Sequence, residues 1–289
     1  PLTIVGSFSP GSASRVLTMG AVFAVASALP LLLVFFGTRE RQVYMEQKQP
    51  TLRQSLRAAF KNRPFVLGLV IFLLTWVSVE ILQATLLYFI KYVVQREGQN
   101  DLIMATIFVT AILALPVWEW ASRRWSKRWA YVAGIAFWAV VQVGMVTLGA
   151  STGLPLIMFM CIMAGIGVSA AHVLPWAIIP DAIEWGEWQT GERHEGIFYS
   201  LITLIRKVTT SLAVPAVGLI LQFTGYVPNA AQQPDSAVRG IRLVIGPIPA
   251  VLLCVGILFA VLYPLTREEY ARVRQELEQR RAMRAEEVV

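Results

Sequence analysis

Seven apolar stretches, each about as long as a lipid bilayer requires, run through this chain of 289 residues. A helix needs roughly 20 apolar residues to cross a hydrocarbon core about 30 Å thick. Runs of this length without two-residue alternation favour helices over a barrel, because lipid leaves backbone polar groups no outside partner. The stretches cover residues 16–37, 65–90, 102–118, 129–149, 154–179, 197–223 and 241–264.

Composition supports the same fold class. Hydrophobic residues make up 56% of the chain and charged residues only 15%, whereas a soluble domain carries about 25% charge. The net charge of +7 does not indicate nucleic-acid binding, because the basic residues lie in the short segments between apolar runs. The sequence therefore predicts an all-α, polytopic membrane protein with about seven transmembrane helices.

The distribution of Lys and Arg predicts the orientation, because cytoplasmic connections are enriched in both. Of the 25 Lys and Arg residues, 18 fall on one side, mainly in segments 38–63 and 119–128 and in the tail 266–289. Five fall on the other side, and the last two, Arg206 and Lys207, lie within a span. We expect a multi-pass protein of the plasma membrane, the inner membrane of a bacterium, with a cytoplasmic C-terminus.

Three ionisable residues, Glu80, Arg206 and Lys207, lie deep in apolar runs. A charge at the bilayer centre costs at least about 2.5 kcal/mol, so such residues usually face a bundle interior or an aqueous cavity. Lys207 follows the start of its span by about 15 Å, near the midplane, and Tyr199 and Thr203 share its helical face. This pattern favours a cavity-lining stripe over a buried ion pair between helices.

The other intramembrane polar residues leave alternatives open. Glu80 fits either the wall of a cavity or an interhelical hydrogen bond. Arg206 points about 100° away from Lys207, towards either a cavity edge or a neighbouring helix. His172 is followed by Pro175 and fits either a packing role or a ligand contact. The sequence contains no nucleophile elbow, phosphate-binding loop or metal-ligand cluster, so we expect neither an enzyme nor a cofactor.

The C-terminal third carries a recognisable set of motifs. They are Pro180-Asp181, Glu184-Trp185-Gly186-Glu187, Thr190-Gly191, Arg193, Glu195-Gly196, Tyr199-Ser200 and Arg206-Lys207. This set resembles the glycoside–pentoside–hexuronide:cation symporters of the major facilitator superfamily, most closely its glucuronide and xyloside carriers. The resemblance is specific over 175–266 and general over 1–150.

The resemblance implies two six-helix bundles, of which this chain would supply the last helix of the first and all of the second. Residues 1–37 would then be a periplasmic segment and the last helix of the N-terminal bundle, and 38–63 the basic central loop. Residues 64–265 would form the C-terminal six-helix bundle and 266–289 a charged cytoplasmic tail. Since the chain starts at Pro1, we expect a fragment that lacks the first five helices.

The resemblance also implies roles for named residues. Lys207 falls on the lysine near the cation and sugar sites, and Thr203 on a threonine of the sugar pocket. His172 falls on an aromatic residue, tryptophan in melibiose permease, which weakens the case for sugar stacking there. The candidate substrate-binding residues are Lys207, Thr203, Tyr199, His172, Arg206 and Glu80. The cation ligands are expected in the missing half, which would also be this chain's main protein partner.

The function implied is symport of a glycoside, pentoside or hexuronide with Na⁺ or H⁺ by alternating access. A lipid or lysolipid carrier of the same fold and a seven-helix receptor are the alternatives. The connection between the fifth and sixth spans is acidic on an otherwise basic side, which favours a cytoplasmic gate over a merely solvated loop. The candidate gate residues are Asp181, Glu184, Glu187, Arg193, Glu195, Arg123 and Arg124.

Overall fold

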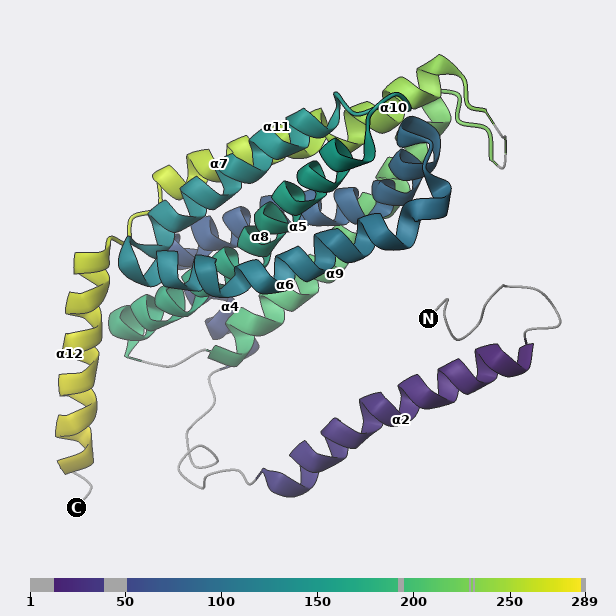
Figure 1. Ribbon diagram of the computed structural model, residues 1–289. Coiled ribbons are helices and arrows are strands. Elements are labelled where there is room, and N and C mark those ends of the chain that lie inside the picture. Colours follow the sequence, from purple (N-terminus) through teal and green to yellow (C-terminus); the bar gives the residue numbers. More distant parts are fainter. Residues whose placement is uncertain (1–12, 39–50, 192–194, 229, 231, 287–289) are drawn as a thin grey trace. The chain divides into compact units, whose positions relative to one another are not determined.

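The computed structural model describes residues 13–38, 51–191, 195–228, 230 and 232–286. Helices make up almost all of this described part, which contains no strand, so the predicted all-α class is confirmed (Figure 1). The chain divides into two units, residues 1–49 and 50–289. Arg193 and most of the central loop lie outside the described residues.

The first unit contains α2 (Ala13–Gly37), a single helix of 25 residues. It is apolar on all sides, with Pro30 inside, and no charged residue follows Arg15. At 1.5 Å per residue, its length of about 37 Å exceeds the thickness of a hydrocarbon core. Such all-round apolarity is typical of a membrane span.

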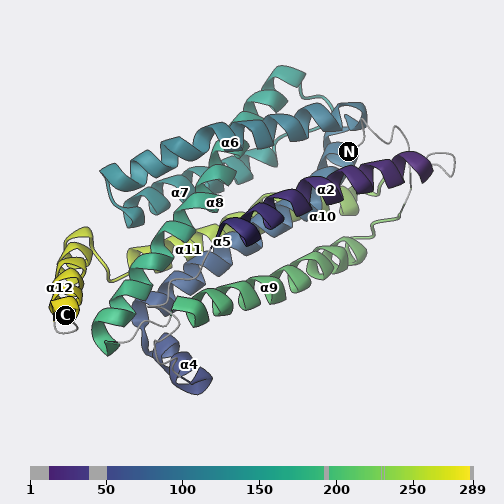
Figure 2. The same ribbon diagram turned by 90° about the horizontal axis from the view of Figure 1, so that it is seen from below.

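The second unit is a helical bundle with a terminal helix at one end (Figures 1 and 2). Its α-helices are α4 (Leu52–Lys61), α5 (Arg63–Tyr88), α6 (Asn100–Arg124), α7 (Lys127–Met145), α8 (Leu154–Thr190), α9 (Glu195–Phe223), α10 (Asp235–Ile245), α11 (Pro247–Val261) and α12 (Arg267–Glu286). A π-helical turn, η2 (Phe89–Val94), extends α5, and the short η3 (Glu97–Gln99) precedes α6.

The core forms where α5, α7, α8 and α11 pack together, with α6 against α8 and α9 against α5. Trp138 of α7 is fully buried beside Gly167 of α8, where a larger residue would collide with the indole ring. Within their most apolar windows, half of α8 is buried but only 17% of α9. α9 therefore leaves most of its surface uncovered by the second unit.

Six helices in the described residues are long and apolar enough to span a membrane, counting α10 and α11 as one. The predicted span 129–149 corresponds to α7, which is not among the six; its spanning role stays a prediction. The span predicted at 241–264 starts earlier, at Asp235, and is broken at Gly246. Gly246 lies against Val146, and Pro247 starts the second segment, so this close approach explains the break.

The expected connection after the fifth span is mostly helix instead. α8 continues for 37 residues to Thr190, so Asp181, Glu184 and Glu187 lie on a helix and not in a loop. Gly191, with φ of 73°, ends it in the left-handed conformation that glycine accepts without strain. The extension gives the acidic residues fixed positions, which a loop would not.

Candidate functional site

The polar stripe predicted on α9 lines a groove of about 410 Å³. Tyr199, Thr203 and Lys207 follow one another at one-turn spacing along its wall, with Ser200 and Leu204 between them. Thr203 and Lys207 are exposed in the second unit. Lys207 makes no ion pair with a carboxylate in the part of the chain that the structure describes.

Arg206 and Thr210 lie on the adjoining face of α9 and contact α5. The guanidinium of Arg206 lies 4.9 Å from the centroid of the Trp76 ring, a cation–π contact. Thr210 donates a hydrogen bond of 2.9 Å to Glu80. Of the two positions that the sequence leaves open for Arg206, the structure shows the one against a neighbouring helix.

Glu80 forms the interhelical hydrogen bond that was one of its two alternatives. Besides Thr210, its Oε1 accepts from the indole nitrogen of Trp76 at 3.0 Å, one turn earlier on α5. The carboxylate therefore joins α5 to α9 and fixes the orientation of the Trp76 ring. Glu80 remains half-buried, so these contacts leave part of its surface open.

His172 lies on the other side of Trp76, with ring centroids 5.4 Å apart and planes at 61°. Its Nδ1 lies 2.8 Å from the carbonyl oxygen of Val168. A carbonyl only accepts, so Nδ1 donates this hydrogen bond, and Nε2 is the acceptor of that tautomer. An Nε2 acceptor in this position can take a hydrogen bond from a substrate hydroxyl.

Trp76 is the residue that the sequence analysis missed. It stacks on Phe72 with ring centroids 5.6 Å apart and an interplanar angle of 2°, and it contacts Glu80, Arg206 and His172. The signal was its spacing: Trp76 precedes Glu80 by four residues, so an indole donor and a buried carboxylate share one face. We call Trp76, Glu80, His172, Arg206 and Thr210 the Trp76 cluster.

A second polar cluster lies at the basic end of the bundle, where α6, α7, α8 and α11 meet α12. Lys127 donates to Asp181 at 2.6 Å, and Asp181 is 7% exposed. Arg123 and Arg124, the two gate candidates of segment 119–128, form no ion pair with Asp181 in the described structure. Arg123 pairs instead with Glu119 on its own helix at 2.6 Å.

The tail helix α12 supplies the other contacts to the acidic end of α8. Tyr270 donates to Glu184 at 2.7 Å, and Trp188 donates to Glu276 at 2.7 Å. Burial and the hydrogen bond to Glu184 raise the pKa of Tyr270, so its phenol stays protonated and remains a donor. Val273 and Leu277, at helical spacing from Tyr270, are buried.

The remaining candidate gate residues are only partly placed. Glu187 lies on α8 and Glu195 begins α9, while Arg193 falls outside the described residues. Within the described ranges, no three His, Cys, Asp or Glu residues come together to hold a metal ion. The location of the cation ligands stays a prediction.

Comparison with known proteins identifies the family. The family model described as MFS/sugar transport protein matches residues 2–267. An uncharacterized symporter of Synechocystis sp. is 34% identical over 80% of this chain and 43% of its own length. A sodium-dependent lysophosphatidylcholine symporter of Danio rerio is 30% identical over 86% of this chain and 47% of its own length.

A protein of Salmonella typhimurium named a sulfoquinovose importer is 29% identical over 92% of this chain and 56% of its own length. The chain thus spans about half the length of these curated relatives. Their names are those of transporters and not of receptors or enzymes. Together with the helical membrane fold, these matches show that the chain belongs to the MFS/sugar transport protein family of multi-pass membrane transporters.

Proposed function

We propose that this chain is the C-terminal half of a sugar:cation symporter that works by alternating access, with Na⁺ or H⁺ as coupling ion. The observation that carries the proposal is the pair of adjacent cations in the middle of α9. Lys207 lies about 18 Å along α9 from Glu195, close to mid-span. Intramembrane charges at this depth usually mark a substrate or ion pathway.

In this proposal, two adjoining faces of α9 take part in substrate recognition. Tyr199, Thr203 and Lys207 offer hydroxyl and ammonium donors along an open groove, which suits a polyhydroxylated substrate. The Trp76 cluster lies on the adjoining face of α9 and adds the Nε2 acceptor of His172. Either cation can pair with an anionic group, so the favoured substrate is a sugar that carries a carboxylate or comparable anion.

Relatives support this substrate class and also a second one. The name of the Salmonella typhimurium relative includes sulfoquinovose, and that of the Danio rerio relative includes lysophosphatidylcholine and sodium. A lysolipid would use Lys207 for its phosphate and the exposed apolar residues beside it, Leu204 and Val208, for its acyl chain. We favour the sugar because four of the five residues that line the groove, Tyr199, Ser200, Thr203 and Lys207, carry a hydroxyl or an ammonium group.

The basic end would provide the reversible closure that alternating access requires. Asp181, Glu184 and their partners Lys127 and Tyr270 join α8 to α7 and α12. In our proposal this end faces the cytoplasm, and these contacts, with others to the missing half, break when the carrier opens inward. The orientation rests on the Lys and Arg distribution.

Uptake by the complete carrier in proteoliposomes tests the proposal. A uronide, its neutral glycoside and a lysophosphatidylcholine of matched concentration are compared with and without a Na⁺ or proton gradient. We expect gradient-driven accumulation of the uronide, weaker uptake of the glycoside and none of the lysolipid. Accumulation of the lysolipid alone would show that the substrate is a lysolipid and not a sugar.

A further inference from the structure

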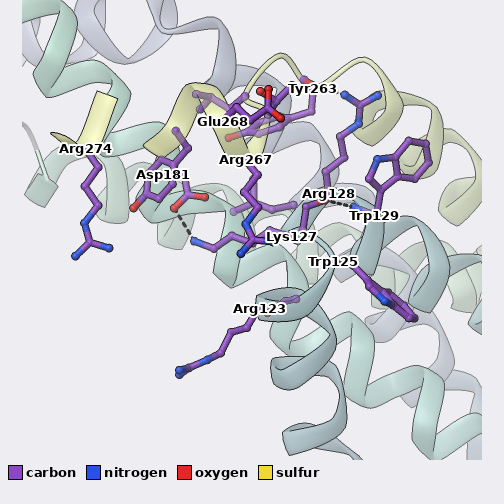
Figure 3. Close-up of a pocket in the computed structure, with 16 residues that line it drawn as sticks. Arg123, Trp125, Lys127, Arg128, Trp129, Asp181, Tyr263, Arg267, Glu268 and Arg274 are labelled. Carbon is purple, nitrogen blue, oxygen red and sulfur yellow. Dashed lines mark hydrogen bonds and ion pairs between the residues drawn. The ribbon is translucent and has the colours of Figure 1, made fainter. Parts of the chain in front are cut away.

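A second pocket lies at the basic end, and it shares no lining residue with the groove on α9. It encloses about 730 Å³, within the range of ligand pockets, and it opens between the α6–α7 turn and the α11–α12 connection. Figure 3 shows its lining side chains, with the Asp181–Lys127 ion pair on one wall. The proposed transport mechanism assigns no ligand to this space.

The pocket wall is strongly cationic. Its acidic residues are Asp181 and Glu268, and its basic residues are Arg123, Lys127, Arg128, Arg267 and Arg274. Three of the five cations have carboxylate partners: Arg123 with Glu119, Lys127 with Asp181 and Arg274 with Glu278. Arg128 and Arg267, the other two, are therefore the cations most available to an anionic ligand.

Arg128 and Arg267 donate only to backbone carbonyls among the described residues. Arg128 contacts the carbonyls of Val261 and Tyr263 at the end of α11, and Arg267 lies 3.5 Å from the carbonyl of Arg124. Carbonyl oxygens orient a guanidinium but do not neutralise it. Neither guanidinium therefore forms an ion pair within the described part of the chain, and Glu268 is the one pocket carboxylate besides Asp181.

The start of α7 adds to the positive potential. Its first turn holds Lys127 and Arg128 and no acidic residue. Helix N-termini carry a partial positive charge, so cations there need an anion close by; Lys127 has Asp181, whereas Arg128 has no carboxylate partner among the described residues. An anion in the pocket would compensate both the side chains and the helix end.

Buried polar atoms without partners give an independent indication of a missing ligand. Tyr263 lines the pocket and is 4% exposed, and its phenol oxygen has no hydrogen-bond partner among the described residues. The Nε of Arg128 is likewise buried and unpartnered in the described structure. An unmade buried hydrogen bond costs about 1–3 kcal/mol, and phosphate oxygens would accept from both groups.

Exposed aromatic residues indicate that the ligand comes from the membrane. Trp125 and Trp129, both on the pocket wall, are each 54% exposed. They continue the exposed apolar surface of α6, which includes Leu113, Val117 and Trp120. Tryptophan is enriched where the bilayer meets water, and basic pockets between helices at that level suit anionic headgroups.

We infer that this pocket binds the phosphate headgroup of an anionic phospholipid from the adjoining leaflet, held by Arg128, Arg267 and Tyr263. The lipid is a bound ligand of the carrier and not its transported substrate. Its acyl chains would lie along the apolar surface of α6 beside Trp125 and Trp129. A soluble phosphate ester shares the headgroup chemistry but lacks this apolar contact.

Lipid titration of the purified full chain in detergent, followed by native mass spectrometry, tests the inference. Phosphatidylglycerol and phosphatidylcholine with identical acyl chains are compared, and glycerol 1-phosphate serves as the soluble competitor. We expect phosphatidylglycerol to bind at least fivefold more tightly than phosphatidylcholine. Glycerol 1-phosphate should displace it only at far higher concentration.

Variants on α12 make the result specific to the pocket. Arg267→Gln should weaken phosphatidylglycerol binding about five- to tenfold, and Arg267→Lys, which keeps the charge, should restore most of it. Arg272→Gln is the matched control, because Arg272 pairs with Glu276 on the same helix and does not line the pocket. Melting temperatures of the variants show whether each remains folded.

Three outcomes would overturn the inference. Equal binding of the two phospholipids would remove the headgroup preference. An equal loss of binding in Arg272→Gln and Arg267→Gln would show a general effect of surface charge. Displacement by glycerol 1-phosphate at the concentration of the lipid itself would assign the pocket to a soluble phosphate ester.

Discussion

The α9 groove and the basic end of the bundle differ in whether their charged side chains have partners. At the basic end, Asp181 is buried and paired with Lys127, and Tyr270 satisfies Glu184. In the groove, Lys207 is exposed and has no carboxylate partner among the described residues. The contrast indicates that contacts within this chain close the basic end, whereas the groove on α9 stays open in the described structure.

Replacing Lys207 should have the largest effect on transport. Lys207→Ala removes the unpaired mid-span cation, so we expect gradient-driven accumulation to fall to background while the protein still reaches the membrane. Uptake against a gradient in proteoliposomes measures this. Lys91→Ala is the control, because Lys91 pairs with Glu97 away from the groove. Accumulation at the normal level by the Lys207→Ala variant would contradict a role of Lys207 in coupling uptake to the gradient.

Breaking the buried pair should destabilise the basic end more than any exposed pair. Asp181→Asn removes the carboxylate that faces Lys127, and we expect a loss of about 1–3 kcal/mol in the free energy of unfolding. Glu119→Gln is the matched control, because its pair with Arg123 is exposed and worth about 0–1 kcal/mol. Thermal melting in detergent compares the two.

The proposal that Asp181 and Glu184 belong to a cytoplasmic gate gives a further prediction. In the complete carrier, Asp181→Asn combined with Glu184→Gln should shift the resting population towards the inward-facing state. Labelling of cysteines placed near the cytoplasmic end would report the shift. Unchanged labelling with intact uptake would leave these residues as structural contacts only.

Substrate preference should depend on Arg206 if it recognises an anion beside Trp76. Arg206→Gln should reduce the apparent affinity for a uronide about tenfold, equal to about 1.4 kcal/mol, and leave the neutral glycoside nearly unchanged. Competition uptake assays with both substrates measure the ratio. A parallel loss for the two substrates would show that Arg206 acts only by holding α5 against α9.

The contact between the tail helix and α8 should give the smallest effect. Tyr270→Phe keeps the ring but removes the hydrogen bond to Glu184. We therefore expect the free energy that holds α12 against α8 to fall by about 0.5–1.5 kcal/mol. Limited proteolysis of the tail reports how readily α12 leaves α8. Arg274→Gln, which breaks an exposed pair within α12, should change it less.

Several features of the fold were predictable because lipid imposes a length and an apolarity on every span. The all-α class followed from the apolar runs, and the shared face of Tyr199, Thr203 and Lys207 followed from helical spacing. The helical extension of α8 to Thr190 was not predicted, because acidic residues after an apolar run look like a loop. The break at Gly246 was also missed, since it depends on the approach of α7.

The sequence by itself determined which charges lie inside the membrane, because hydropathy and spacing fix the depth of Glu80, Arg206 and Lys207. Only the tertiary structure decided their partners. Trp76 became the centre of a cluster because α5, α8 and α9 bring Arg206 and His172 to its ring. Lys127 pairs with Asp181 because it lies in the first turn of α7, which packs against α8. Arg123 lies at the exposed end of α6 and does not pair with Asp181 in the described structure. Partner choice across helices depends on their packing, which no local pattern in the chain records.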